Sequence, residues 1–216
     1  MENIYQLLDK IKSCPIMYLG KNSITALKQF LGGYSYALHS FGIDNPEMPP
    51  FVMFHEWSAY RFKWSESTAG WKNIILEECE GDEARALDVF YQVLEDFKRL
   101  VPIAITKVII QQENRAFYYS PACQIKRGHP SRQTILEKEA PDSIYLIEFS
   151  DLFGYYNYWV QGQTVLDMDR WRYKQRDEAL KRIKMEFGEN LHMVEIEWGE
   201  VERVFEKLVM TPSQTS

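Results

Sequence analysis

His55 and Glu56 stand next to each other in the segment FHEWSAYRFKW, residues 54–64, and they are the residue types that a zinc protease uses. The zinc-protease helix has the pattern His-Glu-x-x-His, which places two imidazoles one turn apart on the metal while the glutamate activates water. Here alanine occupies the second histidine position, and the other three histidines of the chain are not at ligand spacing. The segment therefore predicts no metal and no cofactor.

The same segment has the composition of a buried helical seam. Phe54 and Trp57 are expected to enter the core, while His55 and Glu56 lie on the polar face of the helix. Arg61 follows one turn later, at a spacing that allows it to pair either with Glu56 or with the ring of Trp57.

A nucleophilic cysteine is the second chemistry to consider, because Cys123 and His129 lie in one loop-like stretch. A thiol becomes nucleophilic only beside a base or in an electropositive pocket, and the sequence shows neither. The chain has three widely separated cysteines, which we interpret as reduced thiols outside any disulfide framework. An enzyme whose site combines dispersed residues stays an open alternative, with His55, Glu56 and Arg61, or Cys123 and His129, in that site.

Carboxylates are concentrated in the stretch EECEGDE, residues 77–83, which lies between two expected helices. Its five acidic residues are Glu77, Glu78, Glu80, Asp82 and Glu83. Such a cluster either captures a basic protein partner or serves solubility and helix capping, and we favour the partner.

Basic residues gather in the second half of the chain, some of them interleaved with Trp171 and Tyr173. Arginine and lysine next to aromatic rings suit phosphate contacts combined with base stacking. The residues of this alternative, nucleic-acid-binding surface are Arg115, Lys126, Arg127, Arg170, Arg172 and Lys174. Acidic residues interrupt the basic run after position 168, which is also typical of a solvated helix face.

Composition sets the broad class. The chain has 216 residues, 45% of them hydrophobic, which is enough to bury a core without disulfides or metals. Its formal net charge of −6 argues against a surface built throughout for nucleic acid. The N-terminus lacks the pattern of a secretory signal, and no apolar run approaches the ~18 residues of a membrane span. We expect a cytoplasmic protein that contacts no membrane.

The first part of the chain, residues 1–102, predicts five helices. Asn3 can cap the first, which ends before Pro15, and Asn22 or Ser23 opens the second, which runs to residue 42. A third helix is expected over 50–64, a fourth after Thr68, and a fifth from position 82 until the proline at 102.

The second part, residues 103–210, predicts an α+β domain, and residues 211–216 a disordered tail. The hydrophobic patterns indicate strands over 105–110, 116–120, 143–149, 155–160, 164–168 and 192–198, and helices over 176–187 and 201–209. Short turns between the strands favour antiparallel pairing. The fold class is therefore α+β, with a five-helix domain packed against an antiparallel sheet that carries two helices.

The run PIMYLG, residues 15–20, resembles the RPGMYIG loop of the ATPase subunits of type II topoisomerases. In that family the loop accompanies acidic and glycine-rich segments that hold Mg-ATP, and neither has a counterpart in this chain. We interpret the run as a tight turn that packs Met17 and Tyr18 beneath the first two helices.

Over residues 4–100, the succession of PIMYLG, ITALKQFLGGYSYAL, FHEWSAYRF and GDEARALDVFYQVLEDF resembles a family of small bacterial cytoplasmic proteins of unassigned function. The stretch YLIEFSDLFGYYNYWVQGQTVLDMDRW resembles α+β modules of bacterial immunity proteins, which neutralise toxins. The resemblance implies bacterial origin and supplies no catalytic residue. The leading hypothesis is a non-catalytic protein-binding module, an immunity-type inhibitor of a basic toxin or another basic protein, and the alternative is a nucleic-acid-associated defence or regulatory factor.

Overall fold

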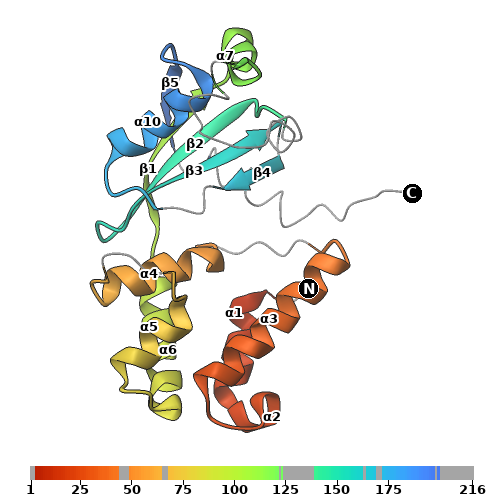
Figure 1. Cartoon of the computed structure of the whole chain (residues 1–216), viewed down its shortest axis with the longest axis vertical. Coiled ribbons are helices and arrows are strands. Elements are labelled where there is room, and N and C mark those ends of the chain that lie inside the picture. Colours follow the sequence, from red (N-terminus) through yellow and green to blue (C-terminus); the bar gives the residue numbers. More distant parts are fainter. Residues whose placement is uncertain are drawn as a thin grey trace. The chain divides into compact units, whose positions relative to one another are not determined.

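The computed structural model describes residues 3–43, 49–64, 68–121, 123, 139–162, 164–168, 172–197 and 199. Within them the α+β prediction is confirmed, with helices in the first half and an antiparallel sheet in the second (Figure 1). The chain divides into two compact units, unit 1 ending at Leu100 and unit 2 beginning at Val101. No helix in this part of the chain is long and apolar enough to span a membrane.

Unit 1 is helical, and its helices begin where side chains can cap them. Asn3 and Gln6 form a reciprocal capping box at the start of α1 (Ile4–Ser13). Ser23 caps α3 (Ile24–Ser40), and Asp82 caps α6 (Glu83–Phe97) by accepting the N–H groups of Ala84 and Arg85. These three capping predictions are confirmed.

Two further helices complete the core of unit 1. A short 3-10 turn, η1 (Phe51–Met53), leads into α4 (Phe54–Arg61), and α5 (Trp71–Glu78) precedes α6. Phe54 and Trp57 of α4 are buried as predicted, and the indole N–H of Trp57 donates to the carbonyl of Val93 in α6 at 3.2 Å. The Phe54 ring contacts four aromatic rings, those of Phe51, Trp71, Phe90 and Phe97.

Unit 2 is a five-stranded antiparallel sheet in the order β4-β3-β2-β1-β5. Its strands are β1 (Pro102–Ile109), β2 (Ser143–Phe149), β3 (Gly154–Gln161), β4 (Thr164–Met168) and β5 (His192–Ile196). The helices that the structure describes in full in unit 2 are α7 (Gln112–Tyr118) and α10 (Arg176–Phe187). One face of the sheet packs against both helices, with Val108, Ile144, Trp159, Ile183 and Phe187 at the centre.

Residues 116–120, predicted as a strand, belong instead to α7 and the turn after it. The aromatic run AFYYS has the composition of a strand, but tertiary contacts select the helix. Asn114 donates from its side chain to the carbonyls of Phe187 and Asn190 at 2.8 and 2.9 Å, and the Tyr118 ring stacks on that of Phe187. These contacts hold α7 at the end of α10.

Other differences concern element ends. The run PIMYLG is a short helix, α2 (Pro15–Leu19), in which Tyr18 packs edge-on against Phe30 but Met17 is 75% exposed, so its predicted burial is wrong. The helix α5 starts after Gly70 and not at Thr68, and α6 ends at Phe97, before the predicted proline stop. The predicted helix 201–209 and tail 211–216 lie outside the described residues.

Replacing Phe54 with alanine is expected to destabilise the protein by about 3–5 kcal/mol, because this fully buried ring joins four other rings and would leave a cavity. Urea unfolding followed by circular dichroism measures the change. Val52→Ala is the matched control, because Val52 is 61% exposed two residues away, and its effect should stay within about 0.5 kcal/mol. Equal effects of the two substitutions would contradict the assignment of Phe54 to the core.

Candidate partner-binding site

The carboxylate cluster predicted from the sequence lies on the turn between α5 and α6. We call residues 77–83 the acidic turn. The helix α5 ends in a Schellman motif, in which Gly81 N–H donates to the carbonyl of Leu76 and Glu80 N–H donates to the carbonyl of Glu77, both at 2.9 Å. Cys79 is buried in the middle of the turn. The backbone is therefore held by its own hydrogen bonds and by one inward side chain.

Two of the five carboxylates have structural roles inside unit 1. Asp82 caps α6, as described above. The carboxylate of Glu83 accepts hydrogen bonds from the hydroxyls of Ser23 and Thr25 at 2.6 and 2.7 Å and from the Thr25 N–H at 3.0 Å. Asp82 thus stabilises the start of α6, and Glu83 binds the start of α3.

Burial by itself would raise the pKa of Glu83. The hydrogen bonds from Ser23 and Thr25, with a smaller contribution from Lys72, outweigh this burial and lower the pKa to about 2. The carboxylate therefore stays ionised and bound to the first turn of α3 over the whole neutral and mildly acidic range.

The other three carboxylates, those of Glu77, Glu78 and Glu80, point to solvent. Glu78 accepts a hydrogen bond from the indole N–H of Trp64 at 2.9 Å. In the part of the chain that the structure describes, none of the three lies within ion-pair distance of a lysine or arginine. Their charge is available to a partner.

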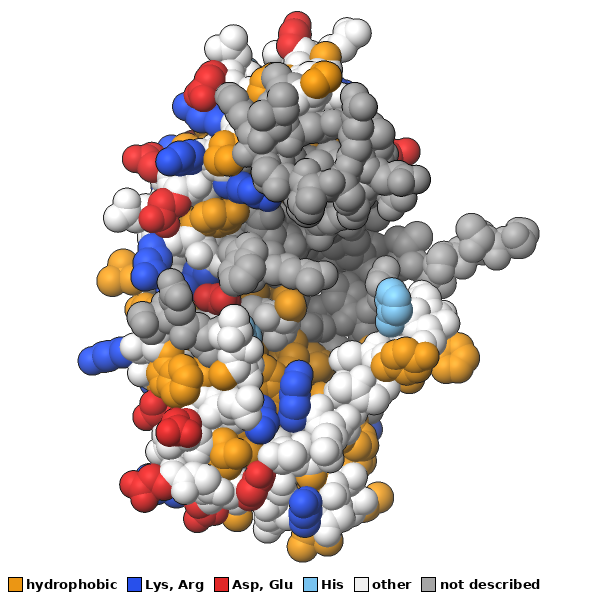
Figure 2. Space-filling model, in the orientation of Figure 1, with side chains coloured by type: hydrophobic (Ala, Val, Ile, Leu, Met, Phe, Trp, Pro, Cys, Tyr) orange, Lys and Arg blue, Asp and Glu red, His pale blue; other side chains and the backbone are white. Residues whose placement is uncertain are grey.

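The acidic turn is the centre of a larger negative region. Residues 71–97, which span α5 and α6, hold eight carboxylates and two basic side chains, a net charge of −6 that equals the net charge of the whole chain. Figure 2 shows red side chains gathered over these two helices. Glu95 and Asp96, at the end of α6, pair with Lys12 and Arg61 from outside this range, so the excess negative charge is concentrated around the acidic turn.

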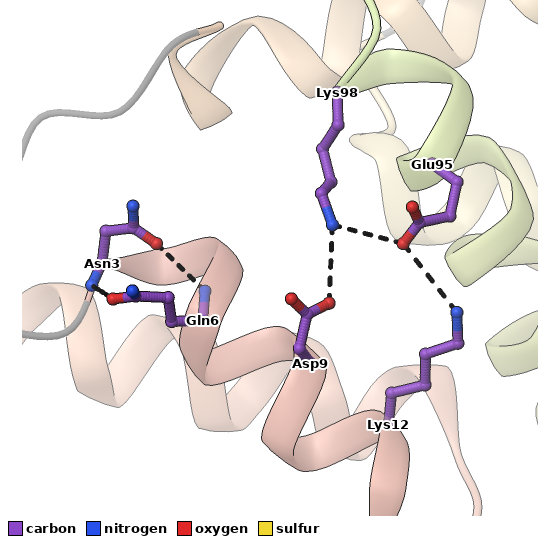
Figure 3. A network of polar contacts seen from close by, with 6 residues as sticks. All are labelled: Asn3, Gln6, Asp9, Lys12, Glu95 and Lys98. Carbon is purple, nitrogen blue, oxygen red and sulfur yellow. Dashed lines mark hydrogen bonds and ion pairs between the residues drawn. The ribbon is translucent and has the colours of Figure 1, made fainter.

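One side of α6 also borders a groove of about 740 Å³ that sequence reasoning missed. Asp88 lines it from α6 and has no ion-pair partner among the described residues, while Lys12 lines it from α1. Beside the groove, Asp9, Lys12, Glu95 and Lys98 form a network of ion pairs that joins α1 to α6 (Figure 3). The one sign of this in the sequence is that Asp88 follows Ala84 by four residues, which places both on the same face of α6.

The groove also contains the ring of Tyr91, which is 5% exposed. Its hydroxyl has no hydrogen-bond partner in the described part of the chain. Burial, and secondarily the charge of Asp9, raises the pKa of this phenol. Tyr91 is therefore a neutral part of the groove wall.

The residues considered for metal or enzyme chemistry do not form a site in the described structure. Arg61 pairs with Asp96 at 2.7 Å and lies 5.7 Å from the centre of the Trp57 ring, so of its two predicted partners it contacts Trp57 and not Glu56. His55 and Glu56 occupy the first turn of α4. Nowhere in the described ranges do three or more potential ligand side chains come close enough to hold a metal ion.

Cys123 is fully buried, and its thiol lies 3.2 Å from the carbonyl of Glu186, to which it can donate. A buried thiol in this position packs against the end of α10. His129, its predicted partner, lies outside the described residues.

The basic residues of the alternative surface are partly committed to contacts inside unit 2. Arg115 pairs with Asp142, whose pKa is lowered first by a hydrogen bond from Gly162 N–H and then by this arginine. Arg172 donates to the carbonyl of Phe153 at 2.7 Å. Lys174 is exposed, and the remaining three, Lys126, Arg127 and Arg170, lie outside the described residues.

Glu83→Gln is expected to lower the free energy of unfolding by about 1–2 kcal/mol near neutral pH, a value discounted because the carboxylate is partly exposed. The folded-state pKa is below the ordinary value of 4.5, so this stabilisation is complete above about pH 5 and is lost as pH falls towards 2. The difference between wild type and variant, measured by urea unfolding at several pH values, should therefore shrink in acid. Glu77→Gln, on the solvent side of the same turn, should change the free energy of unfolding near neutral pH by less than about 0.5 kcal/mol. A difference for Glu83→Gln that does not change with pH would contradict the assignment.

Comparisons with protein-family models, with curated proteins and with solved structures found no significant match.

Proposed function

We propose that this protein is a non-catalytic protein-binding module whose acidic turn captures a basic protein. The observation that carries the proposal is the set of three solvent-facing carboxylates, those of Glu77, Glu78 and Glu80, on a turn with a fixed backbone and without a basic partner among the described residues. A rigid set of like charges attracts a complementary surface without an additional cost for ordering a loop.

The distribution of charge supports the same function. The net charge of −6 over α5 and α6 attracts basic proteins before contact and increases their association rate, and salt weakens this attraction. Toxic nucleases are often basic because they bind the phosphates of nucleic acid. An acidic surface can therefore bind the same basic side chains of the nuclease and block them. An immunity-type inhibitor of a bacterial toxin, acting in the cytoplasm, is the form of this function that we propose.

The backbone of Glu80 gives a second line of support. This residue has φ of +55°, the left-handed conformation that favours glycine at the end of a Schellman motif. A non-glycine residue there costs about 1 kcal/mol of stability. This conformation, which Lys63, Asp151 and Leu152 also adopt, here fixes a carboxylate at the apex of the turn.

No feature of the described residues favours a second function to the same degree. Two of the three described members of the basic surface, Arg115 and Arg172, are already bound inside unit 2. The histidine and cysteine alternatives lack an assembled site in the same part of the chain.

Replacing Glu77, Glu78 and Glu80 together with lysine is expected to abolish capture of the basic partner, because the contact would change from attraction to repulsion. The measurement is a pull-down from bacterial lysate in which each bound protein is quantified by mass spectrometry at low and at raised salt. The wild type should retain one stoichiometric basic protein whose binding weakens with salt.

The matched control for this triple variant is Glu113, Asp177 and Glu197 replaced with lysine. These three are exposed carboxylates of unit 2 without ion-pair partners among the described residues, and the change in net charge is identical. This control should retain the partner. Loss of the partner in both variants, or retention in both, would show that the acidic turn is not the contact surface.

Glu80→Gly should raise the stability of the protein and weaken its binding to the partner. Glycine adopts the left-handed conformation freely, so we expect the free energy of unfolding to rise by about 0.5 kcal/mol after its greater flexibility in the unfolded chain is included. Binding of the partner, measured by titration calorimetry, should weaken because one carboxylate is lost. Glu77→Gln removes a carboxylate without the backbone effect, so it should weaken binding without the gain in stability; unchanged binding in both variants would contradict the proposal.

A further inference from the structure

The C-terminal half of α3 is an exposed helix without charge. Eight of the ten residues from Gly32 to Phe41 are exposed, and Tyr36 and Phe41 are 75% and 79% exposed. Hydrophobic side chains project at this end of α3 in Figure 2. The helix is held to unit 1 through its first half, where Leu27 and Leu31 are buried.

This surface is unusual for the chain. The two longest stretches without Asp, Glu, Lys or Arg are residues 29–43 and residues 152–166, each 15 residues long. The second stretch includes β3, whose residues are buried or half-buried, as expected for a charge-free segment. The first is mostly solvent-exposed and carries two exposed aromatic rings, those of Tyr36 and Phe41, and exposed rings on an uncharged surface mark a site of association.

The outward face of the helix has a bulge next to a hollow. Gly32, Gly33, Tyr36 and Ser40 share this face, because residues three and four apart are neighbours on a helix. A side chain added at either glycine would meet nothing within 4 Å, and both glycines have ordinary helical backbone. Nothing in the described part of unit 1 therefore requires glycine there, although glycine in the middle of a helix is destabilising.

We propose that a second copy of this chain docks on this face. A two-fold axis would place Tyr36 of each copy over Gly32 and Gly33 of the other, so that the bulge of one fills the hollow of its partner. Glycine at such a contact permits close approach of the two helix backbones, which explains why two adjacent glycines stand at this position.

The bulge and hollow on one face make it complementary to itself, which selects a second copy as the occupant, and the absence of charge permits it. Each chain carries a net charge of −6, so two copies repel wherever their charged surfaces meet. The end of α3 brings no charged side chain to the contact and lets like-charged chains associate. A basic partner attracted by the acidic turn would gain no electrostatic attraction from this uncharged face, so the two surfaces have separate occupants and the proposal is independent of the proposed function.

Sedimentation velocity of the full chain from low to high micromolar concentration tests the proposal. The mass should rise reversibly from the 25.6 kDa of one chain towards twice that value. A mass that stays at 25.6 kDa throughout would overturn the dimer.

Two substitutions identify the surface. Tyr36→Glu would place two like charges at the contact and should weaken the dimer about tenfold or more, while the circular dichroism spectrum stays unchanged because Tyr36 is exposed. Met17→Glu is the matched control, since Met17 in α2 is also 75% exposed, and it should leave the dimer intact. Equal effects of the two substitutions would overturn the assignment to α3.

Replacing Gly32 and Gly33 together with alanine should stabilise the monomer and weaken the dimer. The variant should have a higher melting temperature at concentrations where the chain is monomeric, because alanine favours the helix and has room in the monomer. It should dimerise more weakly, because the added methyl groups fill the hollow that receives Tyr36. Dimerisation as strong as that of the wild type would overturn the proposed contact.

Discussion

The carboxylate of Glu83 occupies the first position of α6 and accepts three hydrogen bonds from the first turn of α3. It therefore satisfies an N–H group that a helix start leaves unpaired and fixes two helices against each other at one point. The Ser23 hydroxyl takes part twice, since it accepts from Ala26 N–H as the cap of α3 and donates to Glu83. The acidic turn immediately before α6 and the exposed half of α3 both extend from this junction.

Unit 1 departs from local preferences at the positions where we place function. Glu80 has a backbone conformation that suits glycine, and Gly32 and Gly33 interrupt a helix that alanine would stabilise. Lys63, to which we assign no function, shares the left-handed conformation of Glu80. At Asn3, Ser23 and Asp82 the local and global signals agree, because these residues cap the helices that their positions predict. Departures from local rules that give no internal gain are the expected mark of binding surfaces.

The sequence was most informative where a short-range rule determines structure. Helix caps depend on side chains two or three residues from the groups they satisfy, and antiparallel pairing follows from short turns. The caps at Asn3, Ser23 and Asp82 and the antiparallel pairing were therefore predicted correctly, whereas Thr68 does not cap α5. The strand predicted at 116–120 is wrong because α7 is selected by Asn114 and Tyr118, whose partners lie some 70 residues away. A pattern of neighbouring residues carries no information about contacts that are so far apart in the sequence.

The same limit applies to the candidate site. The cluster of five carboxylates was visible as a run of letters, but the difference between Glu83, bound to Ser23 and Thr25, and Glu80, facing solvent, depends on where α3 lies. Spacing alone also left two partners for Arg61, and the structure adds a third, Asp96 on another helix. Which charges remain for a partner is therefore a property of the tertiary structure.

The acidic turn is joined through Glu83 to the start of α3, and the proposed dimer contact lies in the other half of the same helix. Glu83 meets α3 at Ser23, and Tyr36 lies thirteen residues further, roughly 20 Å along the axis at 1.5 Å per residue. A copy docked at Tyr36 thus leaves the acidic turn accessible, and each dimer would present two such turns. Two linked weak contacts to a partner with repeated basic sites bind far more tightly than one, so dimerisation through α3 would convert a modest, salt-sensitive attraction into stable capture.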